Sequence, residues 1–369
     1  MIKVADFFRT RWRAIVLIAA TYFYFLIFAQ FGFLHRITET VGDAYWNLVL
    51  GAMALAGVCG ALWTAMRFRS ELGTRWLMIG FVGCAAGAFF AVIGTHLFVF
   101  VWSALLSGFS LALLTVAMVG VVATQFPSKH VGLLCGLGTG GAYFLSNVPW
   151  VFEASPLGHC LLAIVACTVG GGVLRNPVHP APEQVIGVAS SSRAMRIMLL
   201  GQVLVFLVLI WTDSAAFTQI QETADLKATS WSGGAHLWAI AAVHFIAAVL
   251  GGVLMDRGRS RLLYGLTFVG LMAGFLLLEH HRLGVLPVLL YAASVSCYST
   301  ALVAFALIQA SELRVVFSAG VVFAVSGWIG SAMGVGMVND LGHVPSCFWA
   351  VAAAVGLSGL LLIGRRVHI

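Results

Sequence analysis

The chain has 369 residues, of which 61% are hydrophobic and only 9% are charged. A water-facing surface needs far more charge, so this composition excludes a soluble globular protein and indicates a membrane protein. The formal net charge of +7 would suggest a nucleic-acid partner in a soluble protein. In a membrane protein it follows from basic loops on one side of the bilayer, and we expect no nucleic-acid partner.

Apolar runs of about twenty residues, each long enough to cross roughly 30 Å of hydrocarbon, recur along the whole chain. Twelve such runs lie near 14–34, 44–66, 76–95, 97–125, 130–151, 157–174, 196–221, 234–255, 262–279, 285–310, 315–338 and 345–364. The first run has no small-residue cleavage site after it, so we interpret it as a transmembrane helix and not as a signal peptide. The sequence therefore predicts an all-α membrane protein with twelve transmembrane helices.

A hydrophilic stretch divides these runs into two sets of six. Residues 176–193 contain three prolines and a serine cluster, a composition typical of a linker. The predicted organisation is an N-terminal six-helix bundle over 1–175, a cytoplasmic linker over 176–193 and a C-terminal six-helix bundle over 194–369.

Three weak matches between the two sets indicate an internal repeat. Residues 27–40 align with 210–223, residues 71–75 with 256–259, and residues 107–113 with 296–302. The matches keep the same order at nearly half the chain length, as expected for two bundles of like topology.

The basic residues fix the expected orientation. With the amino terminus inside, only Arg36, Lys227 and Arg282 fall on the outer side, which leaves 17 of the 20 lysines and arginines inside. Because lysine and arginine are enriched in cytoplasmic loops, we expect both termini to be cytoplasmic.

The loop after the eighth run carries a dense pattern of glycine, acid and arginine, with Gly252, Asp256, Arg257, Gly258 and Arg261 in order. This pattern resembles the short inter-helix loop of the major facilitator superfamily. A degenerate first-half copy is formed by Glu71, Gly73 and Arg75.

The resemblance implies two pseudo-symmetric six-helix bundles that transport a small-molecule substrate across the lipid bilayer by alternating access. The loop would stabilise the outward-open state. We expect a secondary active transporter that acts as a monomer in the cell (inner) membrane, with protons as the candidate coupling ion and no cofactor.

Two polar residues stand at matching positions of the repeat. Asp213 lies about 25 Å along its helix from Arg196, which places it in the outer half of the span. Gln30 is its counterpart in the first run, and a charge within a membrane span is a candidate functional residue. We expect the pair to face each other across a central cavity, with Asp213 exchanging a proton or pairing with a cationic substrate. The alternative is that Asp213 is a solvated loop acid.

Other polar residues within the spans are weaker candidates. His244 could relay protons or contact substrate, or it could simply bond a neighbouring helix. Hydroxyl and aromatic side chains suit a ring-bearing ligand, although small hydroxyl residues also hold membrane helices together. The candidates of this kind are Trp102, Ser107, Asn147, Tyr291 and Tyr298.

The substrate class follows from what the spans lack. Carriers of strong anions need arginine or lysine in the cavity, and the predicted spans carry neither away from their ends. This favours a neutral, zwitterionic or cationic organic solute.

Two other functions stay open. Histidines on the outer side, with the adjacent pair at 280 and 281, would suit capture of a metal or metal chelate, although histidine is also tolerated where lysine and arginine are excluded. A non-transporting assembly factor or sensor could use the same scaffold.

Overall fold

The computed structural model describes residues 4–125, 130–175, 193–279, 285–308 and 312–364. Most of the predicted linker, residues 176–192, lies outside these ranges, as do His280 and His281. The described residues are almost entirely helical and form no strand. This confirms the all-α fold class.

Twelve spans can be followed through the described residues, and two of them are interrupted by π-helical turns. The first span combines α1 (Val4–Tyr24), η1 (Phe25–Gly32) and α2 (Phe33–Val41). The eleventh combines α14 (Glu312–Val322), η4 (Phe323–Ile329) and α15 (Gly330–Leu341). The others are α3 (Trp46–Arg67), α4 (Gly73–Ile93), α5 (Leu97–Gln125), α6 (Val131–Ser146), α8 (Pro156–Leu174), α9 (Arg193–Glu222), α11 (Gly234–Asp256), α12 (Ser260–Glu279), α13 (Leu286–Ile308) and α16 (Ser346–Gly364). Short helices lie between them, namely η2 (Asp43–Tyr45), η3 (Ser70–Leu72), α7 (Pro149–Phe152) and α10 (Ala224–Ser230).

Eleven of these spans are long and apolar enough to cross a membrane, and α6 is the shorter exception. Its 16 residues extend over about 24 Å, less than the hydrocarbon thickness. The sequence-based boundary of 130–151 was too long here. Pro149 cannot donate a helical hydrogen bond and forces Val148 into an extended conformation, so α6 ends at Ser146 and the separate α7 begins.

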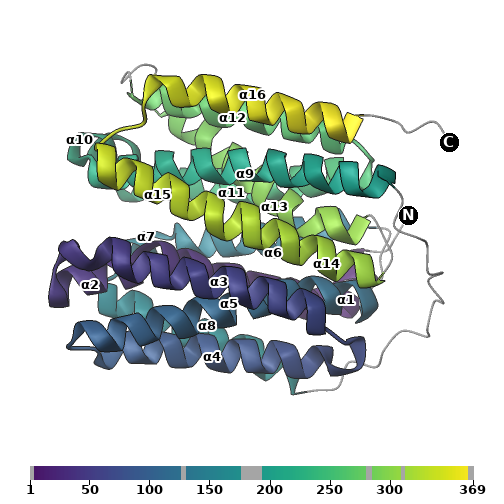
Figure 1. Cartoon of the computed structure of the whole chain (residues 1–369), viewed down its shortest axis with the longest axis horizontal. Coiled ribbons are helices and arrows are strands. Elements are labelled where there is room, and N and C mark those ends of the chain that lie inside the picture. Colours follow the sequence, from purple (N-terminus) through teal and green to yellow (C-terminus); the bar gives the residue numbers. More distant parts are fainter. Residues whose placement is uncertain (1–3, 126–129, 176–192, 280–284, 309–311, 365–369) are drawn as a thin grey trace.

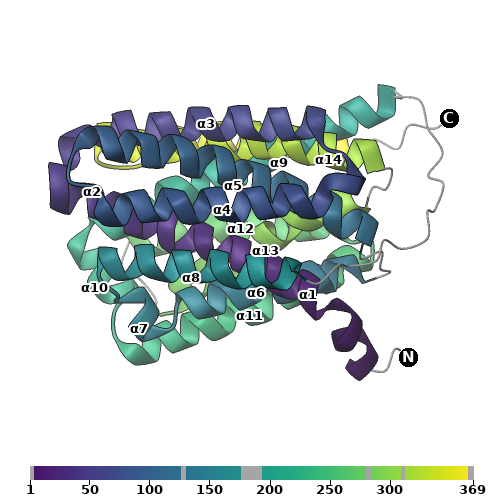
Figure 2. The same ribbon diagram turned by 90° about the horizontal axis from the view of Figure 1, so that it is seen from below.

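The helices run along one common axis and form two groups. In Figure 1 the purple and blue helices up to α8 fill the lower half and the teal to yellow helices from α9 fill the upper half. Figure 2 shows the same alignment of long helices from a second direction. We call these groups the N half and the C half.

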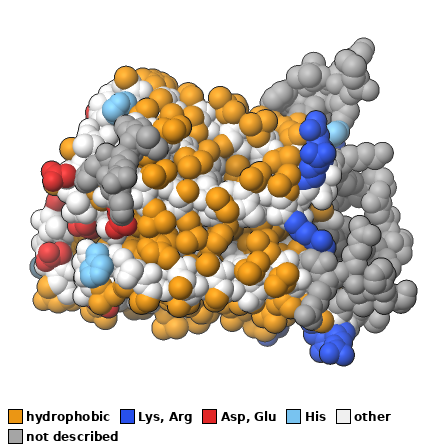
Figure 3. Space-filling view, turned by 90° about the horizontal axis from the view of Figure 1, so that it is seen from above, with side chains coloured by type: hydrophobic (Ala, Val, Ile, Leu, Met, Phe, Trp, Pro, Cys, Tyr) orange, Lys and Arg blue, Asp and Glu red, His pale blue; other side chains and the backbone are white. Residues whose placement is uncertain are grey.

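Charge separates the two ends of the bundle. Both termini lie at the right end of Figure 1, and the blue lysine and arginine side chains gather at that end in Figure 3. The red aspartate and glutamate side chains gather at the opposite end. The basic end contains the α3–α4 and α11–α12 turns, and the acidic end contains α2 and α10.

Small residues bring the halves into close contact. A Cβ on Gly252 of α11 would overlap the backbone carbonyl of Gly132 on α6, and one on Gly136 would overlap the carbonyl of Ala248. Gly140 continues this stripe against Phe245, and such glycine stripes let membrane helices approach closely. On the other side of the interface Gly57 of α3 packs against Trp328 in η4.

Candidate functional site

A small cavity lies between the halves, towards the acidic end. Its walls come from η1, α6, α9, α11 and α13, and α7 and Trp231 cover it. The lining residues are Leu26, Gln30, Phe31, Tyr143, Ser146, Asn147, Phe152, Asp213, Phe217, Trp231, His244, Tyr291 and Val295. Its free space of about 30 Å³ holds only one or two water molecules, so an organic solute does not fit in the cavity in this conformation.

Asp213 lies at the C-half wall of this cavity. It is part of α9, nine residues before the end of that helix, and only 4% of its surface is exposed. The hydroxyl of Tyr291 donates to one carboxylate oxygen and that of Tyr298 donates to the other. These tyrosines are seven residues apart on α13, which is two helical turns, so both reach the same carboxylate.

His244 lies at mid-span of α11 and is almost fully buried. Its Nδ1 is 2.6 Å from the hydroxyl of Ser296 on α13. Its ring stacks on that of Tyr143 from the N half, with centroids 4.6 Å apart and planes 13° apart. The Tyr143 hydroxyl is in turn 2.8 Å from that of Ser299, so His244 belongs to a contact between the halves.

Gln30 faces the same cavity from the N half. It lies in the π-helical segment η1, a distortion that is frequent at functional sites. The next residue, Phe31, makes edge-to-face contacts with Phe217 on α9 and with Phe152. Gln30 and Asp213 therefore line one cavity from opposite halves, and their roles in binding or coupling stay a prediction.

The acidic end of the cavity is closed by a second set of contacts between the halves. Trp231, directly after α10, donates its indole N–H to the side-chain oxygen of Asn147 at 3.2 Å. The Trp231 ring also packs edge-on against Tyr291 and Phe217. Sequence reasoning missed Trp231. The only signal for it was an aromatic residue in the loop shortly after Asp213.

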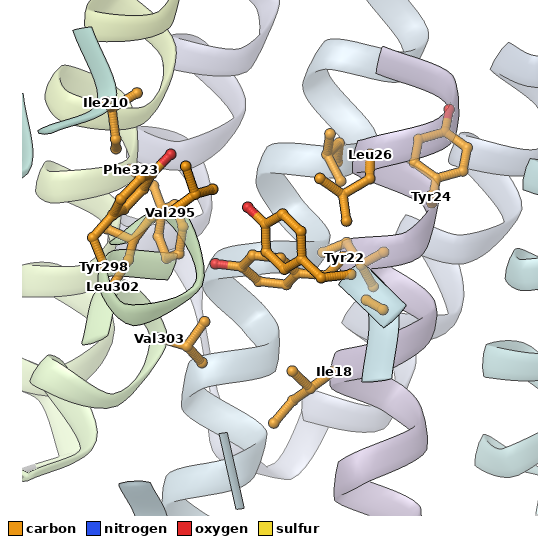
Figure 4. Packing of buried hydrophobic residues seen from close by; sticks show 14 of the residues in the cluster. Ile18, Tyr22, Tyr24, Leu26, Ile210, Val295, Tyr298, Leu302, Val303 and Phe323 are labelled. Carbon is orange, nitrogen blue, oxygen red and sulfur yellow. The ribbon is translucent and has the colours of Figure 1, made fainter. Parts of the chain in front are cut away.

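The middle of the interface below the cavity is filled with side chains. Figure 4 shows Ile18 and Tyr22 of the N half opposite Val295 and Val303 of the C half, whereas Tyr24 points away from them. The Tyr22 hydroxyl donates to the Ser299 carbonyl at 3.3 Å. This layer separates the cavity from the basic end.

The loop after α11 closes the basic end. Asp256 accepts the backbone N–H groups of Gly132 and Leu133, at 2.7 and 2.9 Å. These amides lie in the first turn of α6, where N–H groups lack intrahelical acceptors and favour a negative charge. The C half thus caps a helix of the N half.

The remaining residues of this loop shape it or contact the C half. Gly258 adopts φ +70°, a left-handed conformation that favours glycine, and Arg257 is exposed. Arg261 donates to the carbonyl of Ile363 in α16 at 2.9 Å.

In the degenerate first-half copy of this loop, Glu71 lies in η3, Gly73 begins α4 and Arg75 follows two residues later. Both charged side chains are exposed, and Gly73 is buried.

Two candidate residues lie outside the cavity. Trp102 is 54% exposed and lines an outward-facing apolar groove with Phe98, where lipid would cover it. Ser107 is buried within the N half, where its hydroxyl contacts that of Tyr24 at 3.3 Å. Five residues along a helix turn the side-chain direction by about 140°, so Trp102 and Ser107 cannot share one face. Neither residue lines the cavity, so a substrate contact by either one stays a prediction.

The electrostatics of the cavity are simple. Asp213 is its one acid, and neither lysine nor arginine is among its lining residues. In the part of the chain that the structure describes, no group of three or more histidine, cysteine, aspartate or glutamate side chains could hold a metal ion.

The helices and the cavity between two halves define a multi-pass membrane protein. No protein-family model matches the sequence, and no curated protein matches it. Solved structures match its fold. A crystal structure of FucP, a major facilitator superfamily transporter in the outward conformation, has a TM-score of 0.63 and 16% identity, with 99% of each chain covered. A variant of the E. coli fucose:proton symporter FucP matches with a TM-score of 0.63 and 14% identity, again over 99% of each chain.

The chain therefore has the major facilitator superfamily fold, as the sequence resemblance implied. Transport of fucose is a property of the matched protein. At this level of identity the likeness concerns the fold alone.

Proposed function

We propose that this protein is a secondary active transporter of a small neutral, zwitterionic or cationic organic solute, working by alternating access. The observation that carries the proposal is a small cavity between the two halves, with contacts between the halves on either side of it. Trp231 and Asn147 meet on its acidic side, and Asp256 caps α6 at the basic end. Opening either set of contacts would connect the cavity to one side of the membrane only.

Orientation and domain limits are part of the same proposal. Basic residues are enriched on the cytoplasmic side of membrane proteins, so the basic end with both termini would face the cytoplasm of a cell. The two moving units would be residues 1–175 and 194–369, joined by 176–193.

Asp213 and Gln30 would have different roles. Asp213 can bind a proton or a cationic group, whereas Gln30 can only form hydrogen bonds. If Asp213 carries the coupling proton, we expect Asp213→Asn to abolish proton-driven accumulation while leaving exchange or binding, and we expect Gln30→Ala chiefly to weaken binding. Unchanged accumulation with an unchanged pH dependence in Asp213→Asn would remove Asp213 from the coupling step.

A reversible lock across the acidic end tests alternating access directly. The side chains of Asn47 and Asp340 come from opposite halves and are 3.4 Å apart. Cysteines at both positions would be oxidised in a background where the exposed Cys59 and Cys347 are serine.

Uptake of a panel of radiolabelled neutral, zwitterionic and cationic metabolites would be measured in proteoliposomes. We expect the lock to stop uptake, dithiothreitol to restore it, and each single cysteine to have no effect. Absence of uptake across the panel, with or without the lock, would instead favour a non-transporting assembly factor or sensor on this scaffold.

A further inference from the structure

Building on the proposed transport function, we propose that the solute is an organic cation whose ammonium group binds between the carboxylate of Asp213 and the aromatic rings of the cavity. Three observations carry this inference. They are the hydrogen bonds that Asp213 accepts, the hydrogen bonds that the other polar groups of the cavity already form within the protein, and the aromatic side chains in the walls.

The two oxygens of Asp213 each accept a hydroxyl hydrogen bond, one from Tyr291 and one from Tyr298. An ionised carboxylate accepts hydrogen bonds at both oxygens, and this arrangement of two hydroxyl groups would hold Asp213 in that form. A buried charge is costly unless it is paired, and the lining holds no lysine or arginine to pair with it. A positive charge on the solute would supply the missing partner.

His244 is the one side chain in the lining that can carry a positive charge. Its Nδ1 faces Ser296 and its ring is held against Tyr143, so it is engaged away from the two tyrosines that hold Asp213. A protonated His244 would be the competing source of positive charge in the cavity.

The polar groups of the cavity are mostly occupied by protein partners. Tyr143 contacts Ser299, and the side-chain oxygen of Asn147 accepts the bond from Trp231. A polyol needs many free donors and acceptors for its hydroxyl groups. This cavity leaves few, so its chemistry fits a charged head group better than a sugar.

Aromatic side chains from both halves make up much of the wall. They are Phe31, Tyr143, Phe152, Phe217, Trp231 and Tyr291. Ring faces attract an ammonium group within about 6 Å of the ring centre, and tryptophan does so most strongly. Trp231 is also the residue that covers the cavity on its acidic side, so it would close over the bound cation.

Choline and its neutral isostere 3,3-dimethyl-1-butanol are matched probes, because they differ chiefly in the charge of the head group. Binding to the purified full-length protein in nanodiscs would be followed by tryptophan fluorescence and calorimetry. We expect choline to bind at least tenfold more tightly than the isostere. Asp213→Asn should remove this difference, and Asp213→Glu should restore part of it.

Control variants separate the local effect from general damage. Asp225 is an exposed acid at the same end of the molecule, so Asp225→Asn makes the same charge change outside the cavity and should leave choline binding unchanged. Trp231→Phe keeps a ring and should weaken choline binding about tenfold, in line with the loss of the strongest cation–π partner. His244→Gln should retain the preference for choline. Thermal melting of each variant would verify that it is folded.

The outcomes are distinguishable. Equal binding of the two probes, or loss of the preference in His244→Gln alone, would overturn the cation assignment. A second result would also overturn the cation assignment: uptake of a neutral polyol that stops with the lock between positions 47 and 340, together with no preference for choline. That result would leave the transport proposal intact. If the lock affects no solute, the transport proposal fails and this inference fails with it.

Discussion

The contact between Asp256 and the first turn of α6 gives the sharpest prediction of conformational bias. Asp256→Asn keeps one oxygen acceptor but places an amide donor against a backbone N–H group. The change removes one of the two bonds, at 2.7 and 2.9 Å, and the negative charge at the helix start. A hydrogen bond to a charged group contributes about 1.5–3 kcal/mol, and the interaction with the helix N-terminus about 0.3–1 kcal/mol.

These magnitudes predict the shift in population. One bond remains in the variant. We therefore expect the conformation with the basic end closed to be destabilised by about 1.5–3 kcal/mol relative to the conformation with that end open. Since each 1.4 kcal/mol is a factor of ten, the open population should rise about 10- to 150-fold. Transport should slow with little loss of expression.

Hydrogen exchange at the amides of Gly132 and Leu133 measures this opening directly, because both are protected by Asp256 only while the end is closed. Exchange in a peptide that covers the start of α6 should accelerate by the same factor in Asp256→Asn. Glu71→Gln is the matched control, since Glu71 is the exposed acid of the degenerate first-half loop. Unchanged exchange in Asp256→Asn, or an equal acceleration in Glu71→Gln, would refute the reasoning and leave an ordinary basic turn.

Two further predictions concern stability. Gly252→Ala places a methyl group on the carbonyl of Gly132 and should cost about 1–3 kcal/mol by overpacking, whereas Gly265→Ala, which meets no atom within 4 Å, should leave the melting temperature in detergent unchanged or raise it. Gln219→Ala removes the bond to Glu279 at 2.9 Å and the acceptor for the Val344 N–H at 3.0 Å, and the buried Val344 N–H left unpaired should cost about 1–3 kcal/mol. A melting temperature equal to that of the wild type in Gly252→Ala or in Gln219→Ala would contradict the prediction for that variant.

The sequence alone determined the number of spans, the opposite charge of the two ends of the bundle and the position of Asp213 along its span. Each of these depends on how far a residue lies along a helix, and a rise of 1.5 Å per residue makes that distance readable from the sequence. The break of α6 was also encoded, in Asn147-Val148-Pro149, although the apolar run concealed it. The loop at Asp256 was recognisable because its glycine and charges interrupt that run.

The rotation of each helix was decided only by the tertiary structure. A soluble helix shows its buried face as an apolar stripe, but a membrane helix is apolar all round because lipid and the bundle interior are equally apolar. Nothing in α5 therefore showed that Trp102 faces outward and Ser107 faces into the N half. The partner of Asp256 and the position of Trp231 over the cavity were hidden for a related reason. Both depend on how one half docks on the other, and that docking joins residues more than eighty positions apart in the chain.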